Sequence, residues 1–206
     1  EETCRLAKEA GLLIIGDAKR GDISSTAAAY ARAILDPEGP LGCDSVTLNP
    51  WMGTDTLMPF LPYCESAGRG VFVLLRTTNP GAALLQLHGQ PNASTTLAEK
   101  LAALAPIEDG WSPIGAVVGA MTPDDAKQLR AQLPHAWFLV PGVGAQGGSL
   151  KAALAGARSD GFGALVVCSR ALLYPSSNND LFESDWGSFI AQQIDAMRAR
   201  FDSAEG

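Results

Sequence analysis

Several patterns that mark particular classes of protein are missing from this sequence. The four cysteines, at 4, 43, 64 and 168, form no Cys-x-x-Cys pair and show no metal-ligand spacing. This argues against a structural metal site and favours free thiols in a reducing cytoplasm. The two histidines, His88 and His135, stand far from any charged motif in the sequence. Neither is therefore predicted to be catalytic.

Positive charge and long apolar runs are also scarce. The chain has 15 Lys and Arg against 22 Asp and Glu, a formal net charge of −7. An acidic chain is a poor nonspecific binder of nucleic acid, but it is compatible with an anionic small substrate, which responds to the local field of a pocket. No apolar run reaches membrane-spanning length. We therefore expect a cytoplasmic protein with neither a nucleic-acid nor a membrane partner.

What the sequence does contain is an alternation of short apolar runs and helical stretches. Its 206 residues, 47% of them hydrophobic, suffice for one domain over 1–206 with a sizeable core. The predicted strands lie at 12–15, 45–48, 71–75, 114–118, 137–140 and 164–168. Predicted helices are 3–10 before the first strand, then 24–35, 55–66, 97–105, 122–132, 150–157 and 185–201, with 82–96 ambiguous. Six β-then-α units of this kind predict a parallel sheet with right-handed crossovers.

The polar and glycine-rich clusters all follow strands. This placement favours the C-terminal face of a (β/α)8 TIM barrel, where such barrels bind their ligands. A doubly wound sheet is the main alternative. Its dinucleotide fingerprint would place the glycine-rich turn after an early strand, whereas the glycine-rich turn here follows the fifth.

The first predicted strand, 12–15, is apolar at every position, so we expect it to be buried on both faces, as in a parallel sheet. It leads into four charges within six residues, from Asp17 to Asp22. Because strand side chains alternate, Leu13, Ile15, Asp17 and Lys19 share one face. A carboxylate and an ammonium thus leave the same face at the strand's C-terminal end, where a ligand would bind. Two readings stay open on spacing alone, a ligand site and a solvated turn in which Asp22 caps the next helix.

The glycine-rich turn spans 141–148, Pro-Gly-Val-Gly-Ala-Gln-Gly-Gly. Glycines let the backbone approach a ligand closely and point N–H groups at it. The following helix start adds a positive end, so the turn suits a phosphate. Arg170, after the sixth strand, can clamp the same phosphate with its planar guanidinium. Gln146 inside the turn either orients the ligand or satisfies the loop backbone.

Two further polar residues follow strands. Thr78 comes after the third strand, before Asn79-Pro80-Gly81, and its hydroxyl can read the polar edge of a ring or cap a local turn. Asn49 ends the second strand, where we favour the turn role.

Together these motifs resemble the orotidine 5′-phosphate decarboxylase family, in particular its bacterial type 2 branch. Residues 17–23, Asp-Ala-Lys-Arg-Gly-Asp-Ile, match its D-x-K-x-x-D-I signature. Residues 141–148 resemble its phosphate loop, 169–170 its phosphate-binding Arg, and 77–81 its pyrimidine-reading segment. The motifs occur in the family's order over nearly the whole chain.

The resemblance implies an activity: cofactor-free removal of CO2 from C6 of orotidine 5′-phosphate to give UMP. Asp17 would stand against the substrate carboxylate and Lys19 would protonate C6. Asp22, Ile23 and Thr26 would reach the active site of a partner subunit, so a homodimer is expected. The remaining implied substrate contacts are Thr78, Pro141, Gln146, Gly147 and Arg170.

The chain departs from the family's pattern at its N-terminus. The family's barrel begins with two further strands, which carry an Asp and a Lys of the site. This chain matches strands three to eight, so we expect residues before Glu1.

Two other functions are compatible with the same motifs. The alternative enzyme is a Mg²⁺-dependent sugar-phosphate lyase of the 3-hexulose-6-phosphate synthase or keto-gulonate phosphate decarboxylase type. No additional acidic residue is clearly placed to hold its metal. A noncatalytic phosphate-binding fragment is the other alternative.

Overall fold

The structure is a computed structural model that describes residues 1–206 except 105–106, 121, 144–146, 175–183 and 205–206, and except the side chains of 202–204. Six parallel strands form one sheet in the order in which they occur along the chain. They are β1 (Ile15–Arg20), β2 (Ser45–Leu48), β3 (Gly70–Arg76), β4 (Ile114–Val118), β5 (Phe138–Pro141) and β6 (Ala164–Val167). This sequential order lacks the reversal that defines a doubly wound sheet, and it confirms the predicted barrel class of α/β fold.

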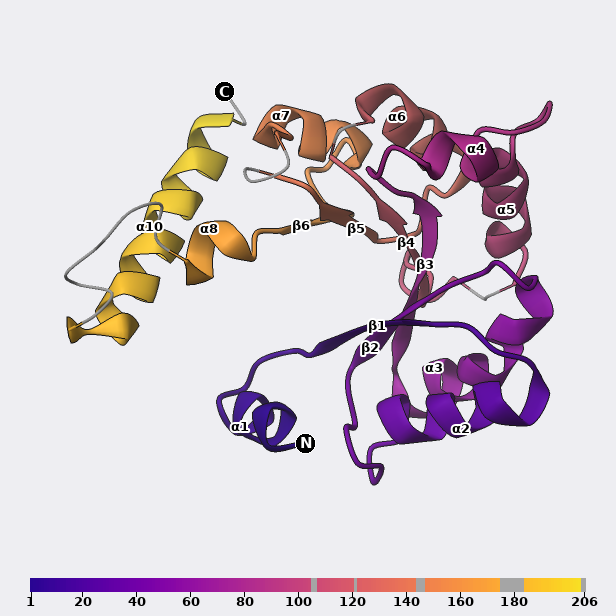
Figure 1. Cartoon of the computed structure of the whole chain (residues 1–206), viewed down its shortest axis with the longest axis horizontal. Helices are drawn as coiled ribbons and strands as arrows, with labels where there is room; N and C mark the ends of the chain where they lie inside the picture. The colour runs from indigo at the N-terminus through magenta and orange to yellow at the C-terminus, as the bar shows by residue number, and fades with distance from the viewer. Residues whose placement is uncertain (105–106, 121, 144–146, 175–183, 205–206) are drawn as a thin grey trace.

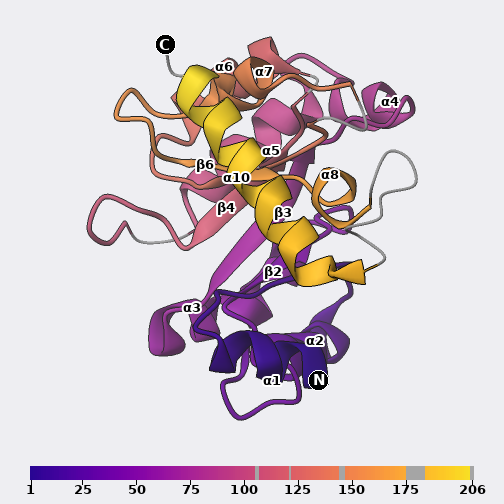
Figure 2. The ribbon, with the colours of Figure 1, turned by 90° about the vertical axis from the view of Figure 1, so that its left-hand side faces the viewer.

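Helices follow the strands and lie along the outside of the curled sheet (Figure 1). The α-helices are α1 (Glu2–Glu9), α2 (Ser24–Leu35), α3 (Leu61–Ala67), α4 (Ala82–Gln86), α5 (Ala93–Ala102), α6 (Pro123–Gln132), α7 (Leu150–Ala153), α8 (Arg170–Leu173) and α10 (Trp186–Ala204). Two 3₁₀ helices are η1 (Thr54–Phe60) and η2 (Leu154–Gly156). Figure 2 shows α1 and α10 on the same side of the sheet.

The alternation of strand side chains divides the apolar residues between two faces. On β3, Val71, Val73 and Leu75 belong to the large core between the sheet and the helices. Phe72 points to the opposite, concave face, where it packs with Val117 of β4 and Leu139 of β5. The concave face is therefore closed at one end by apolar side chains, which leaves its other end for polar groups.

The prediction for the first strand was wrong in position and burial. The strand is the charged segment 15–20 itself, and Leu12 and Leu13, expected to be buried, are 62% and 86% exposed. β1 is an edge strand of the described sheet and pairs only with β2. A strand flanked on one side alone cannot bury its residues as a central strand does, whereas β2 and β4 are buried throughout.

Helix boundaries differ from prediction where proline and asparagine act. The helix expected over 55–66 is split into η1 and α3, with Pro59 inside η1; proline removes a backbone N–H and disfavours a continuous α-helix. α5 begins before the expected 97, because Asn92 caps it by accepting from the Thr95 amide at 2.9 Å. The predicted helix 24–35 and strands 45–48 and 114–118 are confirmed in full.

All four cysteines are free thiols, as predicted; Cys43 and Cys64 are buried, and Cys4 and Cys168 are partly buried. Within the described parts of the chain, no helix combines the length and apolar character needed to cross a bilayer.

Candidate active site

A cavity of about 1270 Å³ opens at the C-terminal ends of the strands. Polar residues from three strand ends and the last residue of β5 line it; these include Asp17, Lys19, Asn49, Thr77, Thr78, Asn79 and Pro141. Apolar residues of the concave face, among them Leu74, Val117 and Leu139, form its floor. The strand ends meet around one cavity, as predicted. A charged pair, the polar candidates for contact with a ring, and an apolar floor all line it.

The Asp17–Lys19 pair lies at the rim of this cavity. The Lys19 ammonium Nζ is 2.5 Å from Asp17 Oδ1, and their side chains are 49% and 61% exposed. The predicted sharing of one strand face is confirmed for Ile15, Asp17 and Lys19, since all three line the cavity. It is wrong for Leu13, which lies before β1 and does not line the cavity. An ion pair this exposed contributes little to stability, so the pair is better understood through what it can do to a ligand.

The Asp17 carboxyl is held in its charged form. Partial burial acts to raise its pKa, but the hydrogen bonds from Lys19 and Thr47 and the positive charge of Lys19 together outweigh this and lower the pKa below its ordinary value. Asp17 is therefore a carboxylate at neutral pH, beside a cation and facing the cavity.

Thr47 is the residue of this group that sequence reasoning missed. It lies on β2, is fully buried, and its Oγ1 is within hydrogen-bond distance of both Asp17 Oδ1 and the Lys19 backbone amide. The only signal in the sequence was a hydroxyl residue within a predicted strand, and Ser45 on the same strand carries a hydroxyl as well. Such a residue is ordinary in a strand, and only the sheet register shows what it faces.

Asp22, Ile23 and Thr26 lie apart from this cavity. None of them is among its lining residues. The Asp22 Oδ1 accepts the adjacent Ile23 amide at 2.8 Å, and Ile23 is itself the N-cap residue of α2, with no side-chain cap bond. The helix-capping reading of Asp22 is therefore wrong. Ile23 and Thr26 are exposed, Ile23 by 58%.

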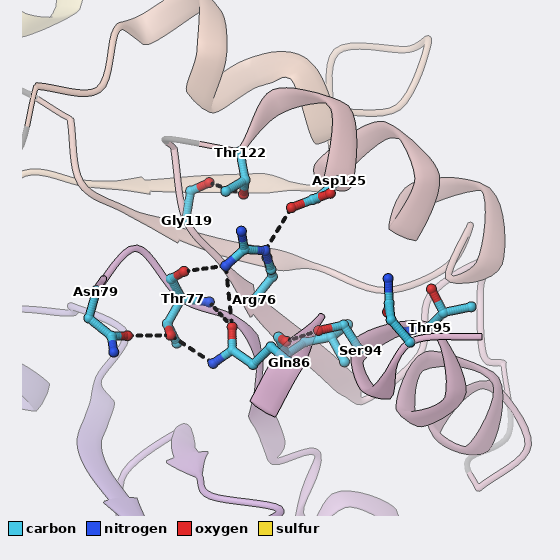
Figure 3. A network of polar contacts seen from close by, with 11 residues as sticks. Arg76, Thr77, Asn79, Gln86, Ser94, Thr95, Gly119, Thr122 and Asp125 are labelled. Carbon is cyan, nitrogen blue, oxygen red and sulfur yellow. Dashed lines mark hydrogen bonds and ion pairs between the residues drawn. The ribbon is translucent and has the colours of Figure 1, made fainter. Parts of the chain in front are cut away.

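The segment that follows β3 is held by a polar network (Figure 3). The Gln86 Oε1 accepts the Thr77 amide at 2.9 Å, and its Nε2 donates to Thr77 Oγ1 at 2.8 Å. Thr77 Oγ1 in turn donates to Asn79 Oδ1 at 2.6 Å. Arg76 adds a bond to the Thr77 carbonyl at 2.8 Å and an ion pair with Asp125 of α6 at 2.6 Å. The loop backbone is therefore anchored to two helices.

Thr78 and Asn49 complete the polar part of the lining. A Cβ on Gly119, at the end of β4, would lie 2.2 Å from Thr78 Cγ2; glycine there makes room for the threonine. Asn49 Oδ1 accepts the Trp51 amide at 3.0 Å, so the favoured turn role of Asn49 is confirmed.

The glycine-rich turn is described at its two ends. The Gly148 amide donates to the Gly142 carbonyl at 3.0 Å, and a Cβ on Gly148 would lie 2.6 Å from that carbonyl oxygen. Gly142 and Gly147 have φ of 109° and 87°, values that L-residues with side chains rarely adopt. Pro141 lines the cavity and Gly147 does not. Gln146 lies outside the described residues.

Arg170 follows the sixth strand, as predicted, and is the first residue of α8, three residues after the end of β6. Its side chain is exposed and makes no hydrogen bond or ion pair with the part of the chain that the structure describes. It is not among the cavity-lining residues. The guanidinium donors are accordingly available to a ligand.

Among the described residues, no three or more His, Cys, Asp or Glu side chains cluster as a metal site requires.

A charged pair at the C-terminal ends of parallel strands, with the loop after β3 and a glycine-rich turn following neighbouring strands, places the chain in the class of α/β-barrel proteins whose sites lie at that face. The family model described as "Orotidine 5′-phosphate decarboxylase / HUMPS family" matches residues 1–178. The chain belongs to this family.

Curated relatives agree. The chain is 40% identical over 193 residues to an orotidine 5′-phosphate decarboxylase of Rhodopirellula baltica, an alignment that covers 87% of the chain and 64% of the relative. It is 42% identical over 187 residues to the corresponding protein of Haloarcula marismortui, with 91% and 65% covered. The chain thus spans just under two thirds of the length of these relatives.

A solved structure supports the fold. The structure of Leishmania donovani OMP decarboxylase superposes with a TM-score of 0.72 at 36% identity, covering 94% of the chain and 72% of that structure.

Proposed function

We propose that the protein decarboxylates orotidine 5′-phosphate to UMP, in the synthesis of pyrimidine nucleotides, without a cofactor. The observation that carries the proposal is the Asp17–Lys19 pair at 2.5 Å, on the rim of a cavity whose other walls present Thr78 and an apolar floor. Membership of the family and the names of the relatives support the same activity.

The chemistry asks for two charged groups with different tasks. Breaking the bond between C6 and the carboxylate releases CO2 and leaves its electron pair on C6, in the plane of the ring, where no carbonyl delocalises it. The Lys19 ammonium stabilises this pair by its charge and donates one proton to C6, giving UMP; the amine then regains a proton from water. Asp17 crowds the substrate carboxylate, and this repulsion ends as CO2 leaves.

Phosphate binding is assigned to the other side of the mouth. Arg170 and the backbone amides of the glycine turn at 141–148, with Gln146 and Gly147, grip the phosphate away from the reacting carbon. Binding energy gained there organises the site around C6. Thr78 and the anchored loop of Figure 3 read the pyrimidine edge.

We propose further that two copies form the working unit. Asp22, Ile23 and Thr26 lie away from the cavity of their own chain, and Ile23 exposes an apolar side chain. A two-fold contact would let each copy supply these three residues to its partner.

We propose a cytoplasmic location, which the free cysteines support.

The test is conversion of orotidine 5′-phosphate to UMP and CO2 by the purified protein, with and without EDTA. Turnover that is unchanged by EDTA is the expected result. Turnover of a sugar phosphate that EDTA abolishes would establish the Mg²⁺-dependent lyase instead. Binding of UMP without turnover of either substrate would establish a noncatalytic phosphate-binding protein.

A further inference from the structure

Thr47 sits directly beneath the reactive pair, where it touches both members and is closed off from the cavity. Its side chain is 0% exposed and it is not a cavity-lining residue. The Lys19 amide is 3.0 Å from Thr47 Oγ1, and Asp17 Oδ1 is 2.9 Å from the same atom. An amide can only donate, so the hydroxyl accepts from Lys19, and its single proton goes to Asp17.

The sheet register explains why a hydroxyl is needed there. Gly16 pairs with Val46, and the next pair is Arg20 with Leu48. Residues 17–19 of β1 therefore stand opposite the single residue Thr47. Such a bulge leaves backbone groups without ladder partners, and here the Thr47 side chain accepts the unpaired Lys19 N–H.

The same bulge places Lys19 in an unusual backbone conformation. Its φ is 47°, in the left-handed region that side-chain-bearing residues seldom adopt. A conformation of this kind persists only where its surroundings fix it. The hydrogen bond from the Lys19 amide to Thr47 is one such constraint. It fixes the backbone of the residue whose side chain ends in the ammonium group.

The bond to Asp17 acts on the carboxylate. Lys19 Nζ and Thr47 Oγ1 both donate to Asp17 Oδ1. The Thr47 bond also contributes to the lowered pKa of Asp17. One buried hydroxyl thus sets the rotation of the carboxylate and favours its charge.

We infer that Thr47 is a positioning residue for the reaction: it holds the Asp17 carboxylate and the Lys19 backbone in the working arrangement without touching the substrate. The inference rests on the proposed decarboxylase function for its kinetic consequence. Its effect on Asp17 follows from the contacts alone.

Three variants separate positioning from simple packing. Thr47→Val keeps the shape and loses the hydroxyl, and Thr47→Ser keeps the hydroxyl. Thr56→Val is the matched control, because Thr56 is also buried, at 2% exposed, and its hydroxyl binds the Gly53 carbonyl at 2.7 Å away from the pair. For Thr47→Val we expect kcat to fall about 10- to 100-fold, the scale of a small misplacement of reacting groups. KM should hardly change, and Thr47→Ser and Thr56→Val should stay near wild type.

A second readout needs no turnover. The ¹³C NMR titration of the Asp17 carboxyl should move to higher pH in Thr47→Val, because a hydrogen bond that favours the charged form is lost. The acid limb of the kcat profile should move in the same direction. If Thr47→Val unfolds, Thr47→Ala is titrated in its place, with the same expectation.

Two results would overturn the inference: an Asp17 titration unchanged by loss of the hydroxyl, or a fall in kcat equal to that of Thr56→Val. A wild-type protein that does not decarboxylate orotidine 5′-phosphate, but whose Asp17 titration shifts in Thr47→Val, contradicts the proposed function and leaves the role of Thr47 toward Asp17 supported.

Discussion

At the scale of single residues, the arrangement of Asp17 and Lys19 carries two local costs in free energy. A lysine at a φ of 47° carries a local cost of order 1–3 kcal/mol, and a carboxylate brought partly out of water resists ionisation. The neighbours offset both: Thr47 binds the Lys19 amide, and Lys19 and Thr47 together keep the pKa of Asp17 below its ordinary value. The residues' roles therefore depend on one another.

Lys19→Ala should abolish decarboxylation while UMP still binds, because the lost group is the proton donor and the phosphate grip is elsewhere. Turnover and UMP affinity, the latter by calorimetry, are the measurements. Lys100→Ala is a matched control, since Lys100 also lines the cavity but comes from α5. Near-normal turnover in Lys19→Ala would remove Lys19 from the role of proton donor.

Arg170→Ala should weaken UMP binding and leave uridine binding unchanged. A hydrogen bond to a charged group contributes about 1.5–3 kcal/mol, which corresponds to a loss of roughly 10- to 150-fold in affinity for each bond removed. Arg198→Ala on α10, which is 77% exposed, serves as the control for a lost surface cation. An equal loss for nucleotide and nucleoside would show that Arg170 does not contact the phosphate.

At the scale of elements, the loop after β3 is shaped by residues outside it. Gln86 belongs to α4, and Asp125, which pairs with Arg76 at the end of β3, belongs to α6. Side chains from these two helices contact Thr77 and Arg76 (Figure 3). The loop that carries Thr78 is therefore held in part by side chains of two other elements, Gln86 and Asp125.

Gln86→Leu should therefore loosen the loop while preserving the volume of the side chain. It removes two hydrogen bonds to Thr77, each worth about 0.5–1.5 kcal/mol, so KM should rise roughly 5- to 100-fold if most of that energy orders the loop. We expect kcat to change much less. Gln128→Leu, at an exposed position of α6, is the control, and a KM unchanged from wild type in Gln86→Leu would contradict the loop's part in substrate binding.

At the scale of the whole molecule, we propose that two copies of the chain share the site. Asp22 follows the strand that carries Asp17 and Lys19 but lies away from their cavity. A two-fold contact is self-complementary, so each copy gives one Asp22 and receives one. The contributions of Lys19 and Asp22 can then be separated genetically, because in a mixed dimer of the two variants both defects fall in one pocket and the other pocket stays intact.

Mixing Asp22→Ala with Lys19→Ala chains should restore activity that neither variant has alone. In a mixed dimer one pocket collects both defects and the other collects none. Random exchange puts about half of the chains in mixed dimers, so roughly a quarter of the wild-type sites return by the symmetry of the contact. Native mass spectrometry establishes that the mixed dimers form; if they do and activity stays at the parental level, Asp22 does not act across the interface.

Periodicity and motif spacing alone were enough to predict the alternating fold, the strand ends that line the cavity, and the strand face shared by Asp17 and Lys19. These depend on local rules: strand side chains alternate, and polar residues after a buried strand meet at one edge of a parallel sheet. The boundaries of the first strand and of α5 were not predicted correctly. Edge position exposed Leu12 and Leu13, and an N-cap at Asn92 began the helix early.

Only the tertiary structure decided which buried residues serve the site. Thr47 is 28 residues from Lys19 in sequence, and it reaches the Lys19 amide because the register of β1 against β2 slips there. Gln86 and Asp125 meet the β3 loop because two helices fold back over one strand end. Register and helix placement are set by the packing of the whole sheet, so no local pattern predicts them. The charged pair, in contrast, comes from Asp17 and Lys19, which lie two positions apart on one strand, so the local sequence is enough to predict it.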